Sequence, residues 1–251
     1  MWNLEYLNKI IERTNKRIVQ QSQKMIEVKP GKQMPEEDQV TIGSGRQMEI
    51  AVLFLDICDY SSWFNDSFES QKVVLAIMNI FMAEMMNIVR DYKGNFEKNT
   101  GDGLMAYFGT EDNDPAKCVE AAIEAALTMH YFNDNLLTPY MYRQGAQTAL
   151  KFRIGIDYGK VTIGKVGVPG GLNSFVAIGT TANIANKLLN IAGPGEIVIG
   201  EHVKRYLPSY RQRYCRLVFQ NTGFVYILNG SPYLAYRYMG RWKHPSILPF
   251  K

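Results

Sequence analysis

The 251-residue sequence contains only three cysteines and three histidines. The cysteines, Cys58, Cys118 and Cys215, are scattered and odd in number, which excludes a disulfide framework and a zinc-ligand spacing. This usage is typical of a reducing compartment, so we expect a cytoplasmic protein.

Long apolar runs are also lacking. No stretch approaches the roughly 18 apolar residues that span a bilayer, and the N-terminus shows no signal-peptide pattern, so no membrane span is expected. A hydrophobic content of 46% with 21% charged residues is ordinary for a globular domain with a sizeable core.

The excess of positive charge is small. The net charge is +4, and it owes much to the Arg- and Tyr-rich segments RYLPSYRQRYCR and YRYMGRWKHP near the C-terminus. Such a surface could contact nucleic acid. A solvated surface is the better interpretation of these residues, so no nucleic-acid partner is expected.

The chain divides into an arm, residues 1–46, and a folded domain, residues 47–251. Apolar residues recur near helical spacing from Leu4 to Ile18, which predicts an amphipathic helix over residues 2–26. Pro and Gly residues between Pro30 and Pro35 then predict a linker.

The first half of the domain reads as strand, helix and hairpin. Ile50 to Leu55 is an unbroken apolar run, which predicts a strand covered on both faces. Residues 68–92 show a helical pattern with a methionine-rich face, which predicts a core helix. The segments NFEKN and LMAYFG are expected to pair as a hairpin around the turn Gly101–Gly103.

The second half continues the alternation. Asp114 and Pro115 predict the N-cap and first position of a helix. LKFRIGIDYGKVTIGKVG predicts two strands around Gly159, and a strand, turn and helix ended by Gly193 follow. EIVIG predicts a further strand, and Asn229-Gly230 predicts a turn between two strands. The order β-α-β-β-α-β with later additions predicts an α+β fold, a ferredoxin-like palm.

Two acidic residues stand out in this order. Asp56 ends the buried apolar strand, where a carboxylate costs several kcal/mol unless it is paired or binds a metal. Asp102 lies between two glycines in NTGDGL. Taken singly, they are an N-cap and a turn residue. The predicted topology places them at neighbouring strand ends, where two carboxylates suit Mg²⁺ with phosphate oxygens completing its shell.

Four motifs carry a family resemblance. AVLFLDICDYSSW resembles the first-strand motif of class III nucleotidyl cyclases, and KNTGDGLMAYFG is similar to their second metal motif. FRIGIDYGKVTIGKVG resembles the central hairpin of that family, and FVAIGTTANIANKL resembles its strand, turn and catalytic helix. The motifs occur in the right order over about residues 49–200.

The resemblance implies a two-metal site and a shared active site. Asp56, the Ile57 carbonyl and Asp102 would bind two Mg²⁺ or Mn²⁺ ions, which activate the ribose 3′-hydroxyl and hold the triphosphate. Residues 54–61 would line the triphosphate, among them Cys58, Asp59 and Ser61.

The catalytic helix implied by the resemblance carries Asn183, which would orient the ribose, and Lys187 at the position where the family usually has Arg. Lysine keeps the charge but loses the bidentate fork. In the family each site forms between two subunits. One chain here carries both halves, which implies a homodimer with two equivalent sites.

Three residues bear on the base. The resemblance places Lys98 at one of the family's two base-reading positions, where Lys argues against guanine. Val176 occupies the other, where purine cyclases often have Asp or Thr, and it can form no hydrogen bond to a base, a loss of roughly 1–3 kcal/mol. Tyr60, at a position usually Phe, would add a bulky polar ring. These departures favour a smaller base.

The departures and the short, helix-armed architecture resemble the pyrimidine cyclases of bacterial anti-phage Pycsar systems. The resemblance implies conversion of UTP to cyclic UMP or CTP to cyclic CMP, read by a separate effector. An adenylate cyclase is the alternative, and a degenerate, nucleotide-binding regulator is a remote one. A diguanylate cyclase would show a Gly-Gly-acid-acid-Phe turn, which NTGDGLM lacks.

Overall fold

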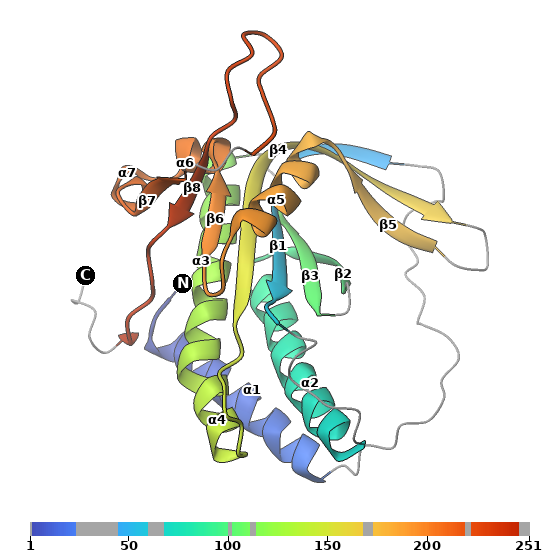
Figure 1. Ribbon diagram of the computed structural model, residues 1–251, viewed down its shortest axis with the longest axis vertical. Coiled ribbons are helices and arrows are strands. Elements are labelled where there is room, and N and C mark those ends of the chain that lie inside the picture. The colour runs from blue at the N-terminus through green and yellow to red at the C-terminus, as the bar shows by residue number, and fades with distance from the viewer. Residues whose placement is uncertain are drawn as a thin grey trace.

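The computed structural model describes residues 2–23, 45–59, 68–99, 102–110, 114–167, 173–218 and 222–245. A mixed sheet forms its centre (Figure 1). The strands are β1 (Gly45–Ile57), β2 (Asn95–Asn99), β3 (Gly103–Phe108), β4 (Phe152–Gly167), β5 (Asn173–Ile178), β6 (Ile197–Gly200), β7 (Cys215–Val218) and β8 (Ala235–Tyr238).

The strand order is β2-β3-β1-β4-β6-β8-β7, and β5 pairs with the second half of β4. The pairs β2–β3, β3–β1 and β1–β4 are all antiparallel, whereas β6 runs parallel to β4. The first four strands therefore have the ferredoxin-like order, and the predicted palm with added strands is confirmed.

Helices cover both faces of the sheet. They are α1 (Leu4–Gln23), α2 (Phe68–Asp91), α3 (Pro115–Phe132), the π-helical turn η2 (Asn133–Leu137), α4 (Thr138–Arg143), α5 (Thr180–Ile191), α6 (Glu201–Tyr206) and α7 (Ser209–Gln212). The main core joins α1, α2 and α3 to one face of β1, β3 and β4. The other face packs against α5.

The methionine-rich face of α2 lies in this core, as predicted, with Phe81 and Met85 fully buried. By length and composition alone Gln71–Asp91 could cross a membrane, which is weak evidence, and 56% of the tested stretch is buried in the fold. Core packing accounts for its apolar character.

The helix start predicted at Asp114 is confirmed. The Asp114 carboxylate accepts hydrogen bonds from the main-chain nitrogens of Ala116, at 2.9 Å, and Lys117, at 3.4 Å, and Pro115 is the first residue of α3. The side chain thereby satisfies two of the donors that a helix N-terminus leaves unpaired.

Two strand predictions are wrong. Gly159 is not a turn, because β4 runs through it without a break. A glycine is needed there because a Cβ would lie 2.6 Å from the Thr181 hydroxyl of α5. Asn229-Gly230 does lie in a turn, closed by Gly230 N–H to Tyr226 O at 2.7 Å, but the flanking chain forms only an isolated bridge, Val225 with Pro232. Figure 1 shows this loop projecting from the sheet.

The contact between β4 and α5 is close at a second glycine. A Cβ on Gly155 would overlap the carbonyl oxygen of Ala185 and the main-chain nitrogen of Leu189. The backbones of β4 and α5 are therefore in direct contact here, and only glycine fits at this position.

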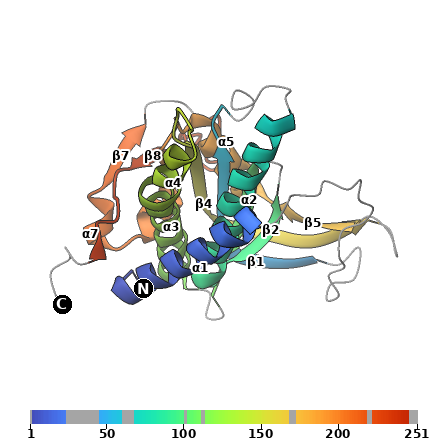
Figure 2. The same ribbon diagram turned by 90° about the horizontal axis from the view of Figure 1, so that it is seen from below.

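The N-terminal arm packs on its own domain. Figure 2 shows α1 running across α2 and α3, and Trp2 stacks on Trp242 with ring centroids 5.6 Å apart. Arg13 of α1 forms ion pairs with Glu84, at 2.6 Å, and with Asp91, both on α2. Burial alone would lower the pKa of Arg13, but these two carboxylates raise it above its usual value. The arm is thus fixed by a buried charge cluster as well as by apolar packing.

Replacement of Arg13 should destabilise the fold strongly. Arg13→Ala removes the ion pairs of Arg13 with Glu84, which is 1% exposed, and with Asp91, and breaking a buried ion pair costs up to about 3–5 kcal/mol. Urea unfolding measures this loss. The matched control is Lys16→Ala, an exposed cation on the same helix, expected to change stability by less than about 0.5 kcal/mol. Equal, small effects of both variants would show that the cluster does not hold the arm.

Candidate active site

The two candidate metal-binding residues lie at neighbouring strand ends, as the topology predicted. Asp56 near the end of β1 is paired with Gly103 at the start of β3. Beside this pair, the Ile57 N–H donates to the Asp102 main-chain oxygen at 3.3 Å. The segments that carry Asp56, Ile57 and Asp102 are therefore held together by the end of one ladder.

A cation that the sequence analysis did not single out stands beside Asp56. Arg153 is paired with Asp56 across β1 and β4, and its Nη2 and Nε donate to Asp56 Oδ2 at 2.9 and 3.2 Å. Both side chains are about a quarter exposed. The sequence contains a signal that could have identified Arg153. A charged residue in the apolar run FRIGI needs a partner for the same reason as Asp56.

The oxygen atoms at this ladder end supply only some of the ligands that a divalent cation needs. Oδ2 of Asp56 is engaged by Arg153, and no described residue donates to Oδ1. Among the described residues no group of three His, Cys, Asp or Glu side chains could hold a metal ion. Two aspartates and main-chain carbonyls therefore fit a divalent ion whose remaining ligands come from a phosphate-bearing substrate.

Helix α5, the candidate catalytic helix, lies on the face of the sheet to which Asp56 belongs. Alternate residues of β1, among them Val52 and Phe54, point to this side, where Ala182 and Ala185 of α5 pack against the strand. Asn183 and Lys187 lie on the other side of α5 and are exposed to solvent. In a single chain these two side chains are accessible to a second molecule.

Only some of the candidate base-reading residues lie in the described part of the chain. Lys98 is paired with Met105 next to a bulge in β2, and half-buried Val176 on β5 is paired with Gly164 of β4. Tyr60 and Ser61 lie outside the described residues.

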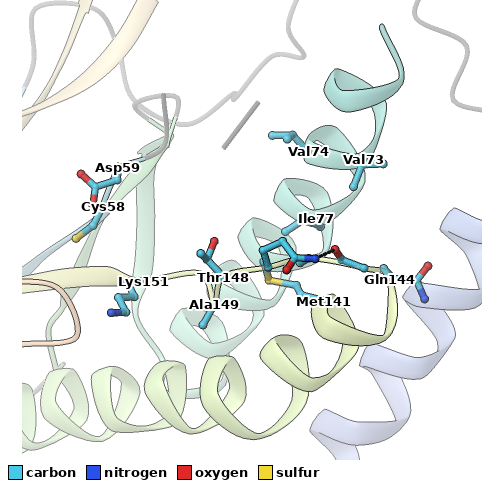
Figure 3. Close-up of a pocket in the computed structure, with 13 residues that line it drawn as sticks. Cys58, Asp59, Val73, Val74, Ile77, Met141, Gln144, Thr148, Ala149 and Lys151 are labelled. Carbon is cyan, nitrogen blue, oxygen red and sulfur yellow. Dashed lines mark hydrogen bonds between the residues drawn. The ribbon is translucent and has the colours of Figure 1, made fainter. Parts of the chain in front are cut away.

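A cavity of about 670 Å³ adjoins the end of β1. Figure 3 shows Cys58, Asp59 and Lys151 along one side and Val74 and Ile77 of α2 opposite. The Cys58 N–H donates a hydrogen bond to the Lys151 carbonyl oxygen at 2.8 Å. Burial raises the pKa of the Cys58 thiol. Asp56, Asp102, Asn183 and Lys187 are not among the described residues that line this space, whereas Cys58 and Asp59, which directly follow Ile57, do line it.

A further acidic residue of β4 is fully buried. The Tyr233 hydroxyl donates to Asp157 Oδ1 at 2.6 Å, and the His202 N–H donates to the Tyr233 hydroxyl at 3.1 Å. Burial raises the pKa of Asp157 to about 8, more than the bond from Tyr233 lowers it. Asp157 therefore holds a proton at neutral pH and ties the projecting C-terminal loop to β4.

A palm-like sheet with two aspartates at adjacent strand ends defines a domain of the α+β class. Residues 42–229 match the family model described as the adenylate and guanylate cyclase catalytic domain, so the chain belongs to this family. The resemblance to class III nucleotidyl cyclases drawn from the four motifs is confirmed.

Curated relatives have more specific names. The chain is 30% identical over 187 residues to a cytidylate cyclase of Staphylococcus aureus, an alignment that covers 72% of this chain and 43% of that protein. It is 25% identical over 206 residues to a uridylate cyclase of Gulbenkiania mobilis, covering 81% and 75%. The chain thus spans less than half of the length of the first relative and most of the second.

Solved structures share the fold. The adenylyl cyclase CyaB from P. aeruginosa superposes with a TM-score of 0.64 at 22% identity, covering 80% of this chain and 98% of that chain. The guanylyl cyclase Cya2 gives a TM-score of 0.66 at 19% identity, covering 79% and 95%. The predicted α+β cyclase fold is confirmed.

The pKa of Asp157 predicts a pH-dependent stability. The Asp157 carboxyl keeps its proton up to about pH 8 in the folded state and loses it near the ordinary pKa of 3.8 in the unfolded state. Its contribution to stability is therefore fully present below pH 3.8. The contribution falls as pH rises towards 8, by at most about 1.4 kcal/mol per pH unit. Asp157→Asn should flatten the fall between pH 5.5 and 8 in urea-unfolding measurements. Glu5→Gln, an exposed acid, is the control, and an unchanged pH profile in Asp157→Asn would contradict the assignment.

Proposed function

We propose that this domain is a nucleotidyl cyclase that converts a nucleoside triphosphate to a 3′,5′-cyclic nucleotide and pyrophosphate. The observation that carries the proposal is the ladder end that joins Asp56 with Gly103 and Ile57 with Asp102, in a chain of the cyclase family. That arrangement gathers hard oxygen ligands where a triphosphate can complete the coordination.

The site residues would act mainly by positioning. Asp56, the Ile57 carbonyl and Asp102 would hold two divalent ions, Mg²⁺ or Mn²⁺, which supply charge neutralisation when bound. Arg153 fixes the orientation of the Asp56 carboxylate and leaves Nη1 outside that pair, available to an anionic phosphate. The turn residues Cys58 and Asp59, with Ser61, would lie along the triphosphate. The ribose 3′-hydroxyl would lose its proton to solvent and its oxygen would attack the α-phosphorus. The bond from that phosphorus to the α,β-bridging oxygen would break, and pyrophosphate would leave.

The second half of each site would come from another subunit. Asn183 and Lys187 are exposed one helical turn apart on α5, so they can approach a nucleotide held by a partner. Asn183 would orient the ribose, and Lys187 would place a positive charge by the transferred phosphoryl group. A two-fold homodimer then contains two equivalent sites.

The favoured substrate is a pyrimidine nucleotide, UTP or CTP. Val176 offers no hydrogen bond to a purine edge, and relatives named cytidylate and uridylate cyclase support the same choice. Lys98 and Tyr60 would contact the base. ATP is the alternative, because a relative from Anabaena cylindrica, 27% identical over 186 residues, is named an adenylate cyclase. A cytoplasmic role in anti-phage signalling, with a separate effector that reads the cyclic product, completes the proposal.

Substrate identity is tested with the purified chain and each of ATP, GTP, CTP and UTP in the presence of Mn²⁺. Mass spectrometry should detect cyclic UMP or cyclic CMP as the main product. Turnover of ATP alone would reject the pyrimidine assignment. Absence of any cyclic product would reject the enzymatic function.

The shared site is tested by mixing two inactive variants. Asp102→Asn should remove metal binding and Asn183→Ala ribose positioning, and each alone should lower turnover to background. After dissociation and random reassociation, half of the dimers are mixed and each has one intact site, so about a quarter of wild-type activity should return. Asp134→Asn, an exposed acid on η2, is the control and should keep full activity. No recovery on mixing would show that each site lies within one chain.

A further inference from the structure

The charges of the chain are unevenly distributed. Residues 202–251 contain nine Lys or Arg and no Asp or Glu, whereas residues 1–201 contain 19 Lys or Arg and 24 Asp or Glu. The C-terminal fifth is thus strongly basic although the whole chain is nearly balanced. Such asymmetry indicates a surface that meets a polyanion.

The described part of this segment gathers at one edge of the sheet. Helices α6 and α7 and strands β7 and β8 lie together at the end opposite β2, with β7 as the last strand in the order (Figures 1 and 2). Strand β1, which carries Asp56, and strand β3, which directly follows Asp102, are separated from β7 by β4, β6 and β8. This edge is therefore distant from the candidate active site.

Aromatic rings are exposed along the edge. Tyr206 on α6, Tyr210 on α7 and Tyr214 before β7 are 38%, 48% and 43% exposed. Their contacts are partial: Tyr206 meets Tyr158 edge-on, Tyr214 is tilted against Tyr238, and the Tyr210 hydroxyl donates to Glu120. Each ring keeps surface that faces solvent.

The arginines of the edge are of two kinds. Arg211 is buried and forms ion pairs with Glu120 and Glu124 of α3, so it serves the fold. Arg213 and Arg216 are exposed, and in the described part of the chain their recorded hydrogen bonds go to main-chain carbonyls instead of carboxylates. Among the described residues, no carboxylate forms an ion pair with either of these two arginines.

A like-charge pair adds to this field. Arg216 of β7 is directly opposite Arg237 of β8, and such cross-strand pairs are destabilising by themselves. Glu196 compensates Arg237 at 2.7 Å. Arg216 lies on the outermost strand and is exposed, so an external anion can reach its guanidinium group.

We propose that the Arg–Tyr edge, defined by Tyr206, Tyr210, Arg213, Tyr214 and Arg216, binds single-stranded nucleic acid. Guanidinium groups fixed by the main chain contact phosphates, and exposed tyrosine rings stack on unpaired bases. The sequence alone favoured a solvated surface. The structure changes this assessment because it brings uncompensated arginines and exposed rings together on one edge.

The composition separates this partner from an anionic membrane. Residues 202–251 contain six Arg and three Lys, and arginine is the cation that binds phosphates in a bidentate manner and stacks on planar rings. Membrane-bound surfaces insert aliphatic or indole side chains beside their cations. The fully exposed aliphatic pair Ile227 and Leu228 belongs to the connection between β7 and β8 and not to the residues that carry the exposed arginines.

Binding is tested with the full chain and four probes. These are fluorescein-labelled 20-nucleotide poly(U) and poly(dT), a 20-base-pair duplex, and vesicles of phosphatidylserine and phosphatidylcholine. Fluorescence anisotropy should show binding to one or both single strands, weakened by salt. Arg213→Gln/Arg216→Gln should weaken it about tenfold or more and lower the slope of log K against log salt by about 1.4, as expected for two lost phosphate contacts. Tyr214→Ala should weaken binding with little change in slope.

The control is Lys16→Gln/Arg90→Gln, two exposed cations on α1 and α2 that change the net charge equally. It should bind like the wild type, and all variants should keep their nucleotide turnover and their unfolding midpoints. Equal weakening by the control pair would overturn the proposal, as would binding to vesicles without binding to either single strand. Absence of binding to every probe would overturn it as well and return the edge to a solvated surface.

Discussion

Antiparallel pairing holds β1 between β3 and β4, and the register of these ladders decides which side chains meet at the end of β1. The ladder with β4 extends from Gly45–Gly164 to Ile57–Phe152. A slip of one residue would turn Asp56 to the opposite face and away from Arg153. Such a slip would exchange the side chains of β1 that pack on α2 and α3 with those that pack on α5, and it would break the Asp56–Arg153 ion pair. Core packing thus determines the position of the candidate metal ligands.

The desolvation cost of a carboxylate is offset in a different way at each of three acidic residues. Glu84 is paired with a cation from the N-terminal arm, so the arm and α2 depend on each other. Asp157 keeps its proton and accepts a hydrogen bond from Tyr233. Asp56 stays partly exposed and shares an arginine. Only this last arrangement leaves a carboxylate oxygen open to an incoming ligand, and it stands at the ladder end that the family resemblance indicates.

Much of this could be predicted because local signals and topology agreed. The apolar run at Ile50–Leu55, the N-cap Asp114 and the Asp-Gly turn each predicted an element, and their order predicted the neighbouring strand ends. The strand break predicted at Gly159 was wrong because the sequence does not distinguish a glycine required by close helix packing from a glycine in a turn. Arg153 was missed because cross-strand partners depend on register, which no local pattern supplies. The exposure of Asn183 and Lys187 likewise depends on which face α5 buries.

The glycine contact between β4 and α5 has a consequence for motion. With the helix backbone seated directly on Gly155, α5 has no side-chain layer over which to slide or tilt at that point. Asn183 and Lys187 are thereby carried by a rigid unit that includes the sheet and Asp56. In the proposed dimer, a change in the separation between the two halves of a site would then require a movement of one whole subunit relative to the other. The two sites of such a dimer would then open and close together.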